Sequence, residues 1–217
     1  MKFSLDTKII KPENENISNA IILLHGYGGD GDDISSLTLN WKRFLPQTIF
    51  LCPNGHEKCP VNPSGYQWFD LSKDDPTYTI EETIKAEEKL NLYIKEIKSE
   101  YNLKNSNICI SGFSQGCMMS INLGLTSEES FNCIVGFSGK IINPSDISKR
   151  IKSKPQMLLI HGDSDAIVPP NRLLEAKDFL MRHNVEIETK MIKNCDHKIP
   201  IEASSIALNY IKKNLYF

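Results

Sequence analysis

The feature that most constrains the fold is a series of short apolar runs separated by longer amphipathic stretches. Continuous apolar character is typical of strands covered on both faces, as in parallel sheets. We therefore expect strands at residues 20–25, 48–53, 107–112, 133–138, 156–162 and 187–192. Apolar residues at helical spacing predict helices at 79–101, 115–125, 172–183 and 201–215. This alternation predicts an α/β fold, a mostly parallel, doubly wound sheet flanked by helices.

At 217 residues the chain is long enough for one α/β domain, residues 1–217, with a substantial core. No internal repeat, low-complexity segment or linker interrupts it. The longest predicted loop, 53–78, is rich in Pro, Gly, Asn and Asp, and such a loop in a compact domain is usually functional or mobile. Thr79 with Glu82 predicts a capping box at the start of the following helix.

The charges nearly balance, since 25 basic and 27 acidic residues give a net charge of −2. This gives no reason to expect nucleic acid or an anionic membrane as a partner. No apolar run approaches the roughly 20 residues that span a bilayer, so no integral membrane association is expected. Asp6 and Lys8 stand where a signal peptide needs an apolar region, which favours a cytoplasmic location.

The cysteines do not have the dense spacing of a disulfide scaffold, and we expect free thiols at positions 52, 59, 109, 117, 133 and 195. Cys52, His56 and Cys59 could in principle ligate zinc. Their spacing matches no common zinc module and a fourth ligand is missing, so the sequence predicts no metal site.

The segment "GFSQG" places Ser114 between Gly112 and Gly116, after a predicted strand and before a predicted helix. This is the pattern of a nucleophile elbow, in which a serine sits on a strained turn and its neighbours must be small. The helix would point its partly positive N-terminus at the site. The alternative is a glycine-rich turn that only joins strand to helix.

A serine hydroxyl needs a base to take its proton, and in this arrangement the chain order is Ser, then Asp or Glu, then His. Two histidines follow Ser114 with acids suitably placed before them, His183 and His197. His183 lies in a predicted amphipathic helix, where an exposed histidine is ordinary. His197 lies in a loop before the final helix, from which it could reach the serine, and we predict it to be the base.

The acid is expected directly after the strand in "LLIHGDSDAIVPP". We predict Asp165 as the residue that orients the base. Asp163 would then form the turn, because aspartate side chains bond their own backbone in tight turns. His161 fits a structural hydrogen-bond donor better than a second base.

An oxyanion hole requires two backbone N–H groups aimed at the developing negative charge. One should come from the residue after the nucleophile, Gln115, and the other from a loop after an earlier strand. The segment "LLHGYGGDGDD" supplies that loop, with Tyr27 as the predicted donor. Phosphate binding is disfavoured, because the glycines match neither a Walker nor a dinucleotide pattern.

Five ordered segments, "LLHGYGGDGDD", "YQWFDL", "GFSQG", "HGDSDAIVP" and "DHKIP", together resemble the phospholipase/carboxylesterase family of α/β-hydrolases. The resemblance runs from about residue 20 to the end of the chain. It implies an α/β-hydrolase fold, the triad Ser114, Asp165 and His197, and oxyanion-hole positions at Tyr27 and Gln115. It also implies hydrolysis of ester or thioester bonds of short to medium acyl groups, without a cofactor and from a site with little lid.

By the same resemblance, Trp68 would flank the acyl groove, although an aromatic residue packing a long loop is the alternative. Three positions depart from the family pattern. Cys117 follows the elbow and suits packing rather than chemistry. Asp196 stands where a glycine commonly precedes the catalytic histidine, and it could place a second carboxylate near the imidazolium. Lys198 replaces a frequent acid.

The function predicted from these residues is a serine carboxylesterase that forms an acyl-enzyme on Ser114. The alternative within enzymes is a thioesterase acting on acylated proteins or other acyl thiols. The alternative outside enzymes is a non-catalytic binding protein on a hydrolase scaffold. The expected partner is a small-molecule ester or thioester or an acylated protein, and the sequence leaves open whether the protein is a homodimer.

Overall fold

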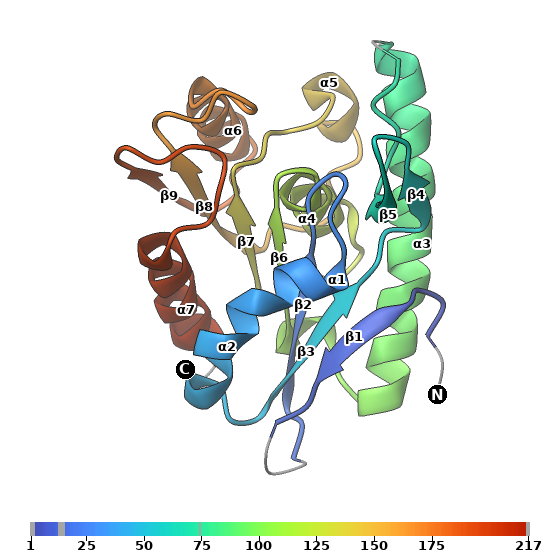
Figure 1. Cartoon of the computed structure of the whole chain (residues 1–217), viewed down its shortest axis with the longest axis vertical. Helices are drawn as coiled ribbons and strands as arrows, with labels where there is room; N and C mark the ends of the chain where they lie inside the picture. The colour runs from blue at the N-terminus through green and yellow to red at the C-terminus, as the bar shows by residue number, and fades with distance from the viewer. Residues whose placement is uncertain (1–2, 13–15, 74, 216–217) are drawn as a thin grey trace.

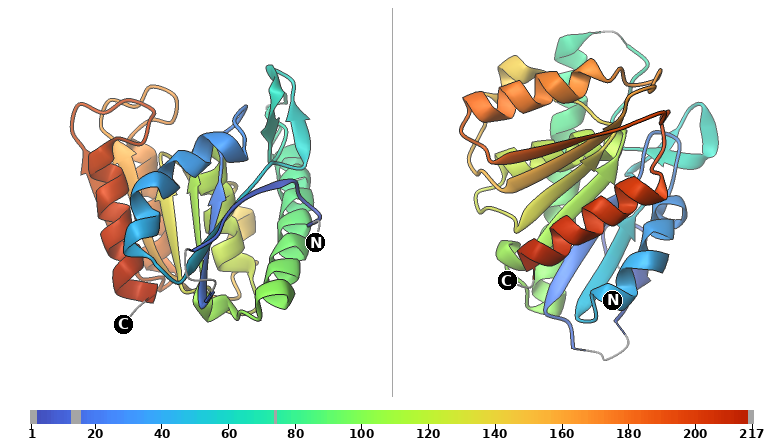
Figure 2. Two further views of the ribbon diagram at one scale, coloured as in Figure 1. Left: turned by 60° about the horizontal axis from the view of Figure 1, so that its bottom comes forward. Right: turned by 90° about the vertical axis from the view of Figure 1, so that its left-hand side faces the viewer.

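The computed structural model describes residues 3–12, 16–73 and 75–215. Its centre is a seven-stranded sheet in the order β1-β3-β2-β6-β7-β8-β9 (Figures 1 and 2). The strands are β1 (Thr7–Ile10), β2 (Asn19–Leu24), β3 (Thr48–Pro53), β6 (Ile108–Phe113), β7 (Cys133–Phe137), β8 (Gln156–Gly162) and β9 (Ile187–Ile192). β1 pairs antiparallel with β3, and every other pair in this sheet is parallel. The predicted mostly parallel sheet is therefore confirmed.

The central strands are largely apolar because helices cover both faces of the sheet. Ala20, Ile22 and Leu24 of β2 pack in one core cluster, whereas Ile21 and Leu23 pack in the other. The first cluster includes residues of α3 (Pro76–Tyr101), α4 (Gln115–Thr126) and α6 (Asn171–Arg182). The second includes residues of α1 (Gly31–Ile34), α2 (Thr38–Trp41) and α7 (Ile201–Leu215). Figure 2 shows these two helical layers on either side of the strands.

The remaining elements are short. They are the 3₁₀ turns η1 (Ser35–Leu37), η2 (Lys42–Phe44) and η3 (Asn105–Asn107), the helix α5 (Pro144–Ile147), and the strands β4 (Glu57–Cys59) and β5 (Asn62–Gln67). β4 and β5 pair antiparallel as a hairpin outside the main sheet. In the described part of the chain, no helix combines the length and apolarity needed to cross a membrane.

Differences from the predicted elements lie mainly at the amino-terminal side. The segment 53–78, expected as loop, contains the β4–β5 hairpin, and edge strand β1 was not predicted. The predicted capping box is wrong. Helix α3 starts at Pro76, and the Asp75 carboxylate accepts a hydrogen bond from Thr77 N at 2.8 Å. Thr79 therefore lies inside the helix, and its hydroxyl donates to the Asp75 carbonyl.

Parallel strands expose all their carboxyl ends at one edge of the sheet, and ligands usually bind there in open α/β sheets. The loops after β2, β6, β8 and β9 leave from this edge. These four loops contain Tyr27, Ser114, Asp165 and His197. The topology therefore brings together segments that are far apart along the chain.

Candidate active site

Ser114 lies on a strained turn between β6 and α4. Its φ of 53° and ψ of −114° fall in a region that non-glycine residues rarely adopt. The two flanking glycines are required by close backbone packing. A Cβ added to Gly112 would lie 2.3 Å from the carbonyl carbon of Gly116, and one added to Gly116 would lie 2.1 Å from the Leu24 carbonyl oxygen. The elbow thus holds the serine against the end of β2.

The structure brings together Ser114, His197 and Asp165. The Ser114 Oγ lies 3.0 Å from His197 Nε2, and His197 Nδ1 lies 2.7 Å from Asp165 Oδ2. A carboxylate can only accept, so Nδ1 carries the proton and Nε2 keeps a lone pair facing the serine hydroxyl. In this arrangement Nε2 can remove a proton from Ser114.

Asp165 is buried and fixed at both oxygens. Its Oδ1 accepts hydrogen bonds from the backbone N–H groups of Ile167 and Val168, each at 2.9 Å. Burial by itself raises the pKa of the Asp165 carboxyl. The hydrogen bonds from His197 and the two amides outweigh burial, so the pKa of Asp165 is lowered. The carboxylate is therefore ionised at neutral pH and oriented toward the imidazole.

The other candidate acids and bases, two histidines and one aspartate, form hydrogen bonds with backbone groups or a neighbouring side chain. His161 Nε2 bonds the Val168 carbonyl oxygen at 2.8 Å, in agreement with its predicted structural role. His183 ends α6 and bonds the Phe179 carbonyl oxygen through Nδ1 at 2.8 Å. Asp163 accepts from the Ser164 hydroxyl at 2.8 Å and from the Cys195 N–H at 3.4 Å. Asp163 thereby connects the loop of Asp165 to the loop of His197.

The predicted oxyanion donors lie beside the serine. Tyr27, Ser114 and Gln115 line one pocket. Gln115 is the first residue of α4, so its N–H has no acceptor within the helix. Among the described residues, no hydrogen bond uses the backbone N–H of Tyr27 or Gln115. Both donors are therefore available to an oxygen bound next to Ser114.

The Gln115 side chain fastens the segment around Trp68. Gln115 Oε1 accepts from Trp68 N at 2.8 Å, and its Nε2 donates to the Phe69 carbonyl at 2.7 Å. The Trp68 indole N–H donates to the His25 carbonyl at 2.9 Å, and the Trp68 side chain is fully buried. Trp68 thus does not flank the groove as expected but packs beneath the loop, while the neighbouring Phe69 lines the pocket.

His25, for which the sequence predicted no role, anchors the loop of Tyr27. Its Nδ1–H donates to the Gly26 carbonyl at 2.7 Å, and its Nε2 accepts from the Gly55 N–H at 2.9 Å. Burial lowers the pKa of His25, so the ring is neutral, as this pair of bonds requires. The only signal in the sequence was a histidine directly before the glycine-rich loop.

The β4–β5 hairpin holds the same loop from outside. Gly28 N donates to the Tyr66 carbonyl at 2.9 Å, and Tyr66 N donates to the Gly29 carbonyl at 2.8 Å. Asn62 Nδ2 donates to the Gly28 carbonyl at 2.7 Å. The segment expected as a loop is therefore part of the scaffold of the site.

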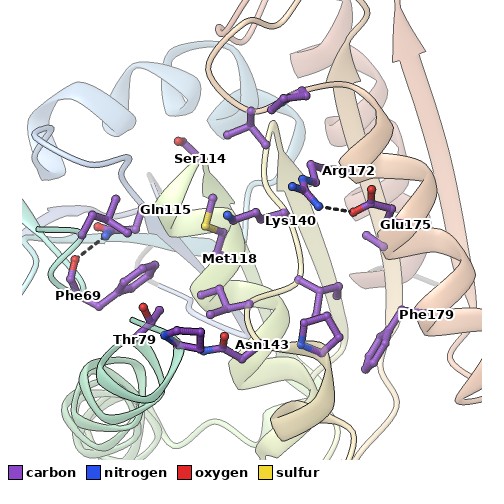
Figure 3. A pocket seen from close by; sticks show the side chains of 18 of the residues that line it. Phe69, Thr79, Ser114, Gln115, Met118, Lys140, Asn143, Arg172, Glu175 and Phe179 are labelled. Carbon is purple, nitrogen blue, oxygen red and sulfur yellow. Dashed lines mark hydrogen bonds and ion pairs between the residues drawn. The ribbon is translucent and has the colours of Figure 1, made fainter. Parts of the chain in front are cut away.

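The larger pocket next to Ser114 has a volume of about 820 Å³ (Figure 3). Apolar side chains form much of its wall, among them Phe69, Met118, Ile142, Val168 and Phe179. Charged groups also line it, and Arg172 pairs with Glu175 at 2.6 Å. Figure 3 shows Ser114 at one end of this pocket.

A smaller pocket of about 360 Å³ lies on the other side of Tyr27. His197, Phe113 and Tyr27 line it together with Ile34, Leu37 and Ile199. The Phe113 ring packs against the His197 imidazole, with ring centroids 4.8 Å apart. Tyr27 lines both pockets.

Of the three positions that depart from the family pattern, one packs in the interior and the other two form an ion pair. Cys117 is buried, and burial raises the pKa of its thiol to about 12, which keeps it protonated. Its sulfur fills the space where a Cβ on Gly136 or Gly139 would stand, so it serves packing. Asp196 and Lys198 form an exposed ion pair at 2.9 Å.

All six cysteines are free thiols and buried. Cys52 lies in β3 and Cys59 in β4. Residues 3–12, 16–73 and 75–215 contain no group of three or more His, Cys, Asp or Glu side chains suited to holding a metal ion.

Comparison with known proteins places these features in a family. The model of the family described as Phospholipase/Carboxylesterase matches residues 5–215. Acyl-protein thioesterase 1 of Saccharomyces cerevisiae is 30% identical over 211 residues, covering 90% of this chain and 92% of the relative. Acyl-protein thioesterase 1 of Emericella nidulans is 29% identical over 187 residues, covering 74% of each chain. The crystal structure of esterase PE8 is 30% identical, with a TM-score of 0.92 and coverage of 97% and 99%.

Proposed function

The chain belongs to the phospholipase/carboxylesterase family of α/β-hydrolases, and we propose that it is a serine hydrolase that cleaves carboxylic esters of short to medium acyl chains. The observation that carries this proposal is the continuous hydrogen-bonded path from Ser114 Oγ through His197 to Asp165, at 3.0 and 2.7 Å. These distances suit direct proton transfer from the serine and orientation of the imidazole.

In the acylation step the Ser114 oxygen attacks the carbonyl carbon of the ester while His197 Nε2 takes the hydroxyl proton. The carbonyl oxygen becomes negative and accepts hydrogen bonds from the backbone N–H groups of Tyr27 and Gln115. The bond to the leaving oxygen or sulfur then breaks as His197 returns its proton to that atom. The products are the acyl-serine and a free alcohol or thiol.

In the deacylation step water takes the place of the leaving group. His197 removes one proton from the water as its oxygen attacks the acyl-serine, and then protonates the departing Ser114 oxygen. Asp165 stays ionised throughout and stabilises the imidazolium that forms twice in each cycle. Every group that this cycle needs comes from the chain itself, so the proposal requires no cofactor.

The larger pocket is the proposed site of the acyl chain, since it begins at Ser114 and Gln115 and has an apolar wall. A volume of about 820 Å³ lies within the range of small-molecule sites and admits chains beyond acetyl. Met118 and Phe69 would contact the first carbons of the chain.

A second candidate function is hydrolysis of acyl thioesters, including those on acylated proteins. The names of the two fungal relatives favour it, since both are acyl-protein thioesterases. Esters and thioesters pass through the same acyl-serine, so comparing both substrate types at matched acyl length distinguishes them.

The test is Ser114→Ala with a short-chain p-nitrophenyl ester as substrate. Hydrolysis should fall to the background rate, and covalent labelling by a fluorophosphonate probe should disappear. Asn143→Ala, on the same pocket wall but away from the path of hydrogen bonds, serves as the control that keeps labelling. An active Ser114→Ala enzyme would refute the proposal. A wild-type protein that neither labels nor hydrolyses esters or thioesters would instead favour a non-catalytic binding protein.

A further inference from the structure

We propose that the smaller pocket binds the alcohol or thiol part of the substrate and selects apolar leaving groups of about the size of an aromatic ring. This inference rests on the proposed hydrolase function and adds to it a second specificity site. Its starting point is that two pockets with different linings, of about 820 and 360 Å³, share Tyr27 in their walls, with Ser114 lining the larger pocket and its hydrogen-bond partner His197 lining the smaller one.

The direction of the leaving group follows from the position of the acid. The leaving atom must come within hydrogen-bond reach of His197 Nε2 to receive its proton. His197 lines the smaller pocket, whereas Ser114 and Gln115 line the larger one. With the carbonyl oxygen between Tyr27 N and Gln115 N, the two remaining substituents of the carbonyl carbon point to opposite sides. The acyl chain then occupies the larger pocket and the leaving group the smaller pocket.

The chemistry of the smaller pocket indicates its ligand. Ile34 and Leu37 are buried in its floor, at 6% and 8% exposure, and Phe113 and Ile199 complete an apolar surface. The Phe113 ring already packs on the imidazole, so an aromatic or branched apolar group could continue that stack. Asp33 and Lys198 also line the pocket and carry opposite charges, which gives no strong preference for a charged leaving group.

Binding of the acyl chain and the leaving group in separate pockets has a kinetic consequence. In the acyl-enzyme the leaving group has departed and the smaller pocket is empty of substrate. Its side chains therefore act on acylation, and thus on kcat/KM, rather than on hydrolysis of the acyl-serine. The larger pocket stays occupied through both steps.

The experiment measures kcat/KM for benzyl acetate and methyl acetate, which share one acyl group and differ only in the alcohol. Ser36 lines the smaller pocket and is exposed, so Ser36→Trp fills the pocket without burying new polar groups. We expect the benzyl-to-methyl ratio to fall by about tenfold or more. Leu39→Trp is the matched control, since Leu39 is 72% exposed nearby in α2 and lines neither pocket. It should leave the ratio unchanged.

A second arm uses Ile167→Trp, at a position that lines the larger pocket and is 71% exposed. It should alter the preference between methyl acetate and methyl hexanoate but not the benzyl-to-methyl ratio. The proposal is overturned if Ser36→Trp leaves that ratio unchanged, or if Ile167→Trp changes it more. Both outcomes can be observed only with an active enzyme. They can therefore be distinguished from a failure of the proposed hydrolase function, in which no ester would be hydrolysed.

Should Ser36→Trp fail to fold, acyl transfer in the wild-type enzyme gives an independent test. An alcohol that attacks the acyl-serine must enter where the leaving group left, by reversal of the same step. Benzyl alcohol should therefore capture the acyl group, forming benzyl ester and free Ser114, with saturation at lower concentration than methanol. Equal, non-saturating capture of both alcohols would contradict the proposal.

Discussion

The acid–base side of the site and the oxyanion side are held in place in different ways. On the acid–base side the proposed reacting groups are side chains, His197 and Asp165, and the bonds that fix them are made by those side chains themselves. On the oxyanion side the proposed reacting groups are the backbone N–H groups of Tyr27 and Gln115. Their positions depend on buried polar side chains that take no part in the chemistry, such as His25.

This difference predicts how each side responds to substitution. Removing a side chain on the acid–base side removes a reacting or orienting group and should reduce turnover with little loss of stability. Removing a supporting side chain on the oxyanion side leaves the donors in the chain but frees the loop that carries them. Stability and turnover should then fall together.

The largest effect is expected for Asp165→Asn. The carboxamide can donate where the carboxylate accepted, which favours the imidazole tautomer whose Nε2 carries the proton and cannot act as a base. We expect kcat to fall by about 10³–10⁴-fold, measured with a p-nitrophenyl ester. Asp163→Asn is the control, two positions earlier, and should retain most of the activity. A fall of less than tenfold in Asp165→Asn would contradict the assigned role.

An intermediate effect is expected for Gln115→Leu. The variant keeps the Gln115 backbone N–H but loses the bonds to Trp68 and Phe69, which leaves buried polar groups without partners. We expect a loss of about 2–4 kcal/mol in the free energy of unfolding and a fall in kcat of about 10–100-fold. Urea unfolding and ester hydrolysis measure the two effects, and Gln156→Leu, at the exposed start of β8, is the control. If the variant lost activity without losing stability, the expected difference between the acid–base side and the oxyanion side would be contradicted.

A smaller, pH-dependent effect is expected for His25→Phe, which keeps an aromatic ring but neither hydrogen bond. We expect it to lose about 1–3 kcal/mol of stability at pH 7.5. Burial lowers the pKa of His25 in the folded protein, whereas the unfolded chain binds a proton below about pH 6.5. As pH falls from about 6.5 toward the lowered pKa, this histidine therefore favours unfolding progressively more.

Wild-type protein should thus lose more stability than His25→Phe between pH 7.5 and 5.5. The measurement is urea unfolding of both proteins at the two pH values. Parallel losses in the two proteins would mean that His25 is not held neutral in the folded state.

The smallest effect is expected for Asp196→Asn. Asp196 could have placed a second carboxylate near the imidazole, but it pairs with Lys198 on the surface. Exposed ion pairs contribute little, so we expect kcat to change by less than about twofold. A change of tenfold or more in kcat at any pH of the pH–rate profile would show that this carboxylate acts on His197.

The central sheet and the convergence of Ser114, His197 and Asp165 could be predicted because their physical requirements appear directly in residue types. Strands buried on both faces must be largely apolar, as β2 and β6 are. Ser114 needs small neighbours because three backbone segments meet there. Asp165 and His197 are polar residues in loops after such strands, in the chain order that the chemistry imposes.

The oxyanion scaffold could not be predicted in the same way. Strand β4 has only three residues, and β5 is partly exposed and contains Pro63, so neither periodicity nor composition distinguishes them from a loop. The role of Trp68 depends on which way its ring turns, and its indole N–H found a buried acceptor in the His25 carbonyl. Long-range bonds such as Gly28 to Tyr66 exist only once the chain has folded.

The β4–β5 hairpin determines how the protein is expected to lose activity on heating. A two-stranded ribbon beside a sheet is marginal on its own, and such elements commonly open at lower free energy than the strands of the main sheet. Release of Tyr66 and Asn62 would free Gly28 while the sheet and its helices stayed intact. Thermal inactivation would then precede melting, because a partly opened ribbon would abolish activity before the circular dichroism signal of the main sheet and helices is lost.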